Sequence, residues 1–188
     1  LFMASQALLE SHPLSEPAMV RELSRRLKPR TTVYVGNSLP IREWDLVAQR
    51  ENAFHVRANR GANGIDGQIA SAAAHRDLQN DLFILVGDLT AMYDSNAPCF
   101  LRDAHYGGAF YLHVINNRGG RIFDRLFRHR LFYNEHGFNF KAWAESWNFA
   151  HTSIQNQWNF PCAPGVVEIV PDAEQTEGFW KKFDGLWK

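Results

Sequence analysis

Two polar pairs, Gly87-Asp88 and Asn116-Asn117, each follow an apolar run that is typical of a buried strand. If both strands belong to one sheet, their carboxyl ends share an edge and the polar tips can meet. The Asp88 carboxylate, the Asn117 amide oxygen and a main-chain carbonyl at Gly119 would then supply about half of the octahedral shell that Mg²⁺ prefers. Because the remaining positions suit phosphate oxygens and water, the sequence predicts a site for magnesium and a diphosphate.

Glycines beside these pairs favour the same interpretation. Gly87, Gly119 and Gly120 would let the backbone approach a bulky anion, and a helix that starts after Asp88 would direct N–H groups at it. A purely structural explanation stays open for each motif, since Gly-Asp can cap a strand end and Asn-Asn-Arg-Gly-Gly can form a surface turn. Their joint placement at strand ends favours a binding site.

The elements that would position these groups alternate between strands and helices. Continuous apolar runs such as residues 82–86 indicate burial on both faces, so we expect an α/β domain with a mainly parallel sheet of about six strands and helices on both faces. Residues 1–14 are expected to be a linker remnant, and residues 15–188 the domain itself. The expected strands are 31–35, 53–56, 82–86, 109–115, 152–154 and 166–170, and the expected helices are 18–27, 41–49, 65–75, 97–105, 140–149 and 173–183.

The composition excludes several classes of protein. Among 188 residues, 20 basic and 20 acidic side chains give a formal net charge of zero, so a cationic surface for nucleic acid is not expected. Cys99 and Cys162 are isolated, which fits neither a zinc site nor a disulfide framework and makes the cytoplasm the default location. No apolar run reaches the roughly 20 residues of a membrane span.

Four polar segments at the expected strand ends resemble one enzyme family. The spacing of Gly87-Asp88 and Asn116-Asn117 resembles the Gly-Asp-Gly…Asn-Asn signature of thiamine-diphosphate enzymes. Together the segments are similar to the C-terminal, diphosphate-binding domain of 2-succinyl-5-enolpyruvyl-6-hydroxy-3-cyclohexene-1-carboxylate synthase, a thiamine-diphosphate enzyme of menaquinone biosynthesis. The resemblance runs in order from about Ser15 to Val170 and is strongest in residues 36–42, 58–67, 87–96 and 116–123.

The resemblance implies a thiamine-diphosphate-binding fold, with thiamine diphosphate and Mg²⁺ (or Mn²⁺) as cofactors. It places Asp88, Asn117 and the carbonyl of Gly119 on the metal. Ile65 would be the bulky aliphatic residue that supports the bent cofactor, although an ordinary apolar residue at a helix start explains it equally. The other positions that match the cofactor site are Gly87, Leu89, Gly120 and Ile122.

In that family 2-oxoglutarate is decarboxylated on the cofactor, and the resulting carbanion adds to isochorismate in a conjugate addition. Because every substrate is polyanionic, Arg42 and Arg60 are expected to bind carboxylates, with Ser38 as a hydroxyl donor. Without the surrounding motifs, both arginines would be interpreted as surface cations. An apolar wall over the substrate, which packing alone would also explain, matches Ile122, Phe123 and Leu126.

Two features of the following loop leave alternatives open. Arg121 stands where the family usually has a smaller or uncharged residue, so an extra cation could face the site and alter the acceptor. The loop over residues 123–138 could be a lid that gathers anions or, equally, a solvated basic loop. Its basic residues are Arg125, Arg128, His129, Arg130 and His136.

The resemblance also implies what this sequence lacks. In the family, the glutamate that activates the cofactor lies in a separate N-terminal pyrimidine-binding domain, usually contributed by the other subunit of a dimer. We therefore assign no catalytic residue, and expect that domain and a second copy as partners of a chain that is inactive alone. The glutamates that match nothing in the activating motif are Glu10, Glu16, Glu22, Glu43 and Glu51.

Two other functions remain open from the sequence. Another thiamine-diphosphate 2-oxoacid decarboxylase or carboligase would share Asp88 and Asn117 but need not share residues 37–42. A noncatalytic nucleotide-binding module is less favoured, because Gly61, Gly64 and Gly67 do not have the Gly-x-Gly-x-x-Gly spacing of dinucleotide sites.

Overall fold

The sheet is the centre of the molecule. The computed structural model describes residues 2–51, 53–61, 63–77, 79–102, 108–127, 129–156 and 163–186. Within them, six strands form one sheet with the order β2-β1-β3-β4-β6-β5, and every neighbouring pair is parallel, which confirms the predicted fold class. The strands are β1 (Thr32–Val35), β2 (His55–Arg57), β3 (Leu82–Gly87), β4 (Phe110–Ile115), β5 (Ala150–Ile154) and β6 (Gly165–Ile169).

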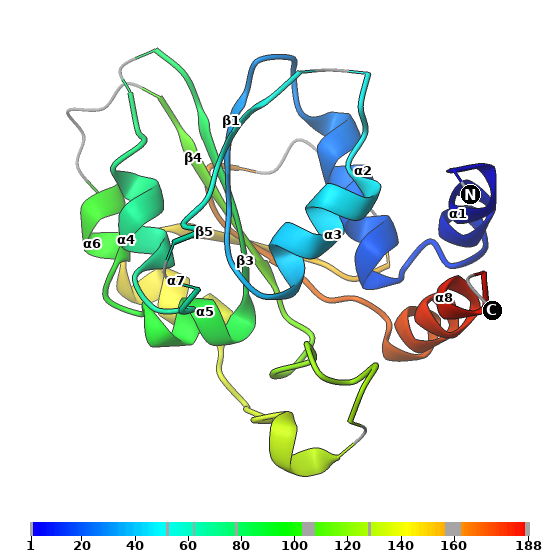
Figure 1. The fold of residues 1–188 in the computed structure, drawn as a ribbon. Helices are drawn as coiled ribbons and strands as arrows, with labels where there is room; N and C mark the ends of the chain where they lie inside the picture. Colours follow the sequence, from blue (N-terminus) through cyan, green and yellow to red (C-terminus); the bar gives the residue numbers. More distant parts are fainter. Residues whose placement is uncertain are drawn as a thin grey trace.

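Helices cover both faces of the sheet (Figure 1). One layer contains α1 (Phe2–Ser11), α2 (Glu16–Arg26), α3 (Leu39–Val47) and α8 (Ala173–Gly185). The other contains α4 (Gln68–Ala73), α5 (Asp88–Tyr93), α6 (Pro98–Leu101) and α7 (Phe140–Ser146). A short 3₁₀ helix, η1 (Arg130–Phe132), lies in the loop between β4 and α7, and this loop projects beyond the two layers.

Side chains of the central strands alternate between two hydrophobic cores. In β1, Val33 and Val35 pack with the first helical layer, whereas Tyr34 belongs to the core of the second. In β3, Leu85 faces the first layer and Ile84 the second. Because each face is buried by helices, these strands consist of uninterrupted apolar residues rather than alternating polar and apolar ones.

The order of the strands brings the polar segments together. β3 lies between β1 and β4, and the registers pair Val35 with Leu85 and Gly87 with Ile115. The loops that follow Gly36, Gly87 and Asn116 therefore leave from one edge of the sheet, as predicted. This shared edge positions the candidate site.

Several elements differ from the expected ones in extent. The segment assigned to a linker remnant contains α1, whose Leu9 is buried in the core with α2 and α8. The helix expected over 65–75 is shorter, because Gly67, with φ of 67°, precedes its start at Gln68. The helix expected over 97–105 ends at Leu101 in the described residues, and 103–107 lie outside them, as does Cys162. No helix among the described residues has the length and apolarity needed to cross a membrane.

Candidate metal and diphosphate site

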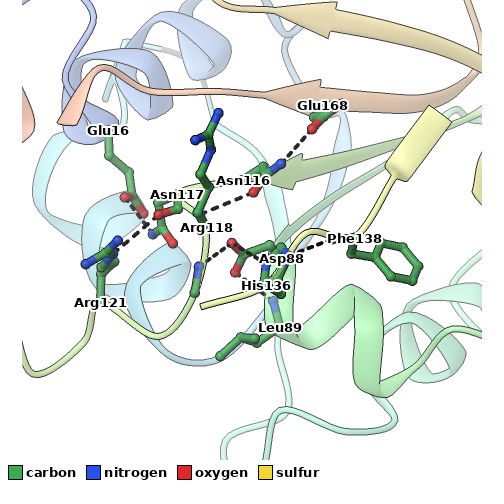
Figure 2. Close-up of polar contacts among 11 residues, drawn as sticks. Glu16, Asp88, Leu89, Asn116, Asn117, Arg118, Arg121, His136, Phe138 and Glu168 are labelled. Carbon is green, nitrogen blue, oxygen red and sulfur yellow. Dashed lines mark hydrogen bonds and ion pairs between the residues drawn. The ribbon is translucent and has the colours of Figure 1, made fainter. Parts of the chain in front are cut away.

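The Asp88 carboxylate is held at the junction of β3 and α5. Asp88 is 2% exposed. Its Oδ1 atom accepts a hydrogen bond from the Leu89 N–H at 2.7 Å, and its Oδ2 atom accepts one from the Gly119 N–H at 2.8 Å (Figure 2). Burial raises the pKa of Asp88, while these N–H groups and His136 act in the opposite direction. The acid from β3 is thus tied to the loop that follows β4.

His136 completes the surroundings of this carboxylate. Its Nε2 atom lies 3.1 Å from Asp88 Oδ2, and both side chains are almost fully buried. The N–H of Phe138 donates to His136 Nδ1 at 3.2 Å, which places the proton of a neutral ring on Nε2, the atom that faces Asp88. His136, expected only as part of a basic loop, therefore contacts a predicted metal ligand.

The two asparagines after β4 have different roles. The Asn117 Nδ2 atom donates to Glu16 Oε2 at 2.9 Å, which leaves a buried Oδ1 atom that has no hydrogen-bond partner among the described residues. The Asn116 Nδ2 atom instead donates to Glu168 Oε1 at 2.6 Å, and Glu168 Oε2 lies 3.0 Å from His151 Nε2. Asn116 anchors the end of β4 to β6, whereas Asn117 offers a free oxygen to the site.

Most of the predicted cofactor residues line one small pocket at the strand ends, which we call the strand-end pocket. It is lined by Glu16, Ser38, Leu39, Pro40, Ile65, Gly87, Asp88, Leu89, Thr90, Asn117, Gly119, Gly120 and Arg121. At Gly87, a Cβ atom would meet nothing within 4 Å, so this position opens toward free space. At Gly119, with φ of 136°, a Cβ atom would lie 2.1 Å from the Tyr133 carbonyl oxygen. Glycine is needed there because two chain segments come close together and the backbone has a positive φ.

The groups in the strand-end pocket fit a hard divalent cation. A buried carboxylate and a buried amide oxygen without a partner are the ligand types that Mg²⁺ and Mn²⁺ accept. Within the described part of the chain, no group of three or more His, Cys, Asp or Glu side chains could hold a metal ion by itself. The protein's share of the coordination shell is therefore partial, as a metal shared with a diphosphate requires.

The predicted carboxylate-binding residues gather at the end of β1. Ser38 has φ of 74° and ψ of −132°, a backbone conformation that is rare for a residue other than glycine. Arg42 Nη1 donates to the Ser38 carbonyl at 2.7 Å, and Arg60 Nη1 donates to Asn37 Oδ1 at 3.0 Å. Both arginines are exposed, whereas Asn37 is buried and joins their loops. Arg42 and Arg60 thus lie around the end of β1 with Ser38, although Ser38 alone of the three lines the strand-end pocket.

The predicted apolar wall is not brought to the strand-end pocket. Ile122, Phe123 and Leu126 lie outside its lining, and Leu126 is 73% exposed. Phe123 packs instead against Phe127 and Phe132, at ring-centroid distances of 6.2 and 6.0 Å. In the chain alone, this segment is an exposed apolar surface.

Arg121 is engaged by its own loop. Its Nε atom donates to the Asn117 carbonyl at 3.3 Å, its guanidinium lies 4.3 Å from the centroid of the Tyr133 ring, and Nη1 lies 3.7 Å from Asp124 Oδ2. The residue lines both the strand-end pocket and a larger cleft of about 860 Å³ between this loop and α8. The extra cation noted in the sequence does reach the site.

Two buried glutamates were not expected here. Glu16 and Glu43 are 2% and 0% exposed, and burial raises the pKa of Glu16 to about 7 and that of Glu43 well above its ordinary value. The sequence carried a signal for Glu43 only: it lies on the same stripe of α3 as Pro40, Trp44 and Val47, all of which are buried. Glu16 and Asn117 are 101 residues apart in the sequence, so no local sequence pattern indicates their contact.

Comparison with known proteins gives a consistent result. No family model matches the sequence. Over 189 residues, 96% of this chain and 35% of the relative, it is 42% identical to a 2-succinyl-5-enolpyruvyl-6-hydroxy-3-cyclohexene-1-carboxylate synthase of Bdellovibrio bacteriovorus. The synthase of the same name from Akkermansia muciniphila is 40% identical over 92% of this chain and 35% of the relative. The chain therefore spans about a third of the length of these curated relatives.

A solved structure shows the same fold. A protein from Mycobacterium smegmatis, described as a thiamin diphosphate-dependent enzyme, superposes with a TM-score of 0.59 at 14% sequence identity. The match covers 85% of this chain and 31% of that protein. At this identity the likeness concerns the fold alone.

Proposed function

Because the chain belongs to the 2-succinyl-5-enolpyruvyl-6-hydroxy-3-cyclohexene-1-carboxylate synthase family, we propose that it is the domain of such an enzyme that binds the diphosphate of thiamine diphosphate through a Mg²⁺ ion. The enzyme would be a transferase of menaquinone biosynthesis, which decarboxylates 2-oxoglutarate and joins the product to isochorismate. The curated relatives are longer than this chain, so this activity is proposed for the complete protein.

One observation carries the proposal. The Asn117 Oδ1 atom is buried without a hydrogen-bond partner among the described residues, in the same small pocket as the Asp88 carboxylate. A buried polar atom without a partner is costly, and a cation shared with Asp88 would satisfy both groups. The carbonyl of Gly119 is the third ligand that we propose from the chain.

The residues around this site would divide the remaining tasks. When bound, thiamine diphosphate supplies the carbon nucleophile on which a 2-oxoacid loses its carboxylate. Ile65, in the lining of the strand-end pocket, would support the cofactor from below. Ser38, Arg42 and Arg60 would bind the substrate carboxylates from the rim at the end of β1.

The part of the enzyme that activates the cofactor would come from outside this chain. We propose that a pyrimidine-binding domain of the same protein supplies the activating glutamate, and that Ile122, Phe123 and Leu126 form the wall of the substrate site only when that domain is present. A homo-oligomer in the cytoplasm is the assembly that this arrangement favours.

The decisive experiment replaces Asp88 by Ala in the complete protein. Loss of the single charged ligand should weaken the binding of thiamine diphosphate by about 10-fold to 100-fold or more at limiting Mg²⁺, measured by titration calorimetry. Asp45→Ala is the matched control, because the Asp45 side chain is 89% exposed on α3. Equal affinity of the Asp88→Ala and parent proteins at low Mg²⁺ would exclude the assigned role.

Product analysis then separates the proposed reaction from that of related enzymes. With 2-oxoglutarate and isochorismate together, the complete protein should form the conjugate adduct. A different thiamine-diphosphate decarboxylase or carboligase would bind the cofactor through Asp88 and Asn117 but release another product.

A further inference from the structure

We propose that Glu16 is a positioning residue that orients the Asn117 amide toward the metal. The inference rests on the proposed function, since it concerns how the chain prepares one ligand of the metal. Glu16 is the first residue of α2, and it reaches the end of β4 from the opposite side of the strand-end pocket to Asp88 (Figure 2).

An amide side chain has two ends of opposite character. Its oxygen can bind a cation, whereas its NH₂ group would repel one. In Asn117, the NH₂ group donates to Glu16 Oε2 at 2.9 Å, and this hydrogen bond fixes the opposite orientation for Oδ1. Without an acceptor at this place, both orientations of the amide become accessible and only one of them can bind the metal.

Glu16 is itself held firmly enough to act as a fixed acceptor. The Glu16 N–H donates to Thr176 Oγ1 of α8 at 3.0 Å, and the preceding residue Ser15 accepts from the Ala18 N–H at 3.4 Å as the cap of α2. Glu43 on α3 is also fully buried, and neither of its carboxyl oxygens has a hydrogen-bond partner among the described residues. The backbone that carries the acceptor is therefore held by α2 and α8 before any metal arrives.

Two conservative variants of Glu16 distinguish whether the length of its side chain or its charge orients Asn117. Glu16→Gln keeps the length of the side chain and an acceptor oxygen but removes the charge. Glu16→Asp keeps the charge and the acidic oxygens but is shorter by one methylene group, so it withdraws from Asn117. Both substitutions replace one polar side chain by another at the N-terminus of α2, where an acidic or polar residue is accommodated.

The measurement is the affinity of the complete protein for Mn²⁺ in the presence of thiamine diphosphate, followed by electron paramagnetic resonance. Glu16→Gln should bind Mn²⁺ within about 3-fold of the parent, and Glu16→Asp should bind it about 10-fold more weakly or worse, the usual cost of losing the partner of a metal ligand. The same two substitutions at Glu22, a partly exposed residue on the same helix that pairs with Arg26, should leave the affinity unchanged.

A double-mutant cycle shows whether Glu16 acts through Asn117. In an Asn117→Ala background the amide is absent, so Glu16→Asp should cause no further loss of Mn²⁺ affinity. An additional loss of the same size in that background would mean general damage to the fold and would overturn the inference. So would equal affinity of Glu16→Asp and the parent, or a Glu16→Gln variant as weak as Glu16→Asp, which would show that charge is what matters.

The failure of this inference is distinguishable from the failure of the proposed function. If the parent protein binds no Mn²⁺ with thiamine diphosphate, the proposed function itself is wrong. If the parent binds both and the Glu16 variants do not follow the predicted order, only the role of Glu16 is wrong.

Discussion

The strand ends and the loop after β4 contain the two halves of one predicted site, but they are held in different ways. Asp88 at the strand ends is 2% exposed, whereas Leu126 and Leu131 in the loop are 73% and 82% exposed. Around Asp88 the partners come from distant parts of the chain, such as Gly119. In the loop, Phe123 and Phe127 pack mainly against each other and their sequence neighbours.

This difference indicates which half of the site the chain builds alone. Long-range hydrogen bonds fix the orientation of the buried polar groups around Asp88, because few other hydrogen-bond partners are available in a buried site. An exposed apolar loop gains little from its present position and is stabilised by whatever surface covers it. This contrast supports the proposal that the chain prepares the metal end and that another surface completes the substrate end.

The largest expected effect is the loss of activity in a chain that lacks the surface proposed to complete the substrate end. The 188-residue chain expressed alone should show no turnover of 2-oxoglutarate, because the carboxylates that line its strand-end pocket, Glu16 and Asp88, belong to the metal end. It should also bind thiamine diphosphate weakly, since the second half of the contacts is missing. Turnover by the purified chain, measured as release of CO₂, would mean that an activating base lies within it.

The next effect is a loss of stability with rising pH, which reports on the buried glutamates at the metal end. Burial raises the pKa of Glu16 from 4.5 to about 7, so the folded state holds this proton more tightly than the unfolded state. Stability should therefore fall between about pH 4.5 and 7, by up to about 3 kcal/mol, and level off above. Burial also raises the pKa of Glu43, which adds a loss of stability in the same direction as the pH rises.

Urea unfolding of the metal-free protein at several pH values tests this prediction. Glu16→Gln should be more stable than the parent at about pH 8 and have a flatter profile. Burial of His113 lowers its pKa to about 4, so His113 costs stability as the pH falls below 6.5 in parent and variant alike, and it cancels in the comparison. Parallel profiles for the two proteins would contradict the prediction.

The sequence predicted the two regions unequally well. The strands were predicted because burial on both faces demands continuous apolar runs. The meeting of Asp88 and Asn117 in one pocket was predicted because their motifs directly follow such runs. Glu16 was noted only as a glutamate that matches nothing in the activating motif, since its partner Asn117 is 101 residues away. His136 was treated as a loop residue for the same reason, because only the folded chain brings it to Asp88.

The extent of α1 and the position of the loop after β4 could not be predicted from the sequence, for a different reason. Residues 1–14 are rich in helix-forming residues but have no clear apolar stripe, and α1 packs through Leu9 in the core with α2 and α8. The apolar wall was predicted by resemblance, at Ile122, Phe123 and Leu126. If another domain completes this surface, as we propose, this chain's own contacts cannot position it.

A smaller effect is expected at the rim that joins the two regions. Arg42→Lys keeps the charge but loses the planar guanidinium, which should cost about 1–3 kcal/mol in kcat/KM of the complete enzyme for 2-oxoglutarate or isochorismate. One Nη atom of Arg42 already donates to the Ser38 carbonyl, so the remaining donors are the ones available to a carboxylate. Arg25→Lys, on the last turn of α2, is the control. If kcat/KM is unchanged for both substrates, Arg42 is a surface residue.

The smallest effect on stability is expected in the loop. Leu126→Ser and Leu131→Ser in the chain expressed alone should change the free energy of unfolding by about 0.5 kcal/mol or less, because both side chains are already exposed to water. The same substitutions should reduce self-association, measured by sedimentation velocity, because they remove apolar surface that is exposed in the described part of the chain. Leu101→Ala is the contrasting control, since Leu101 is buried in the core with α4 and its loss should cost about 2–5 kcal/mol. A large destabilisation by Leu131→Ser would show that the loop is packed in solution, and the contrast between the two halves of the site would then disappear.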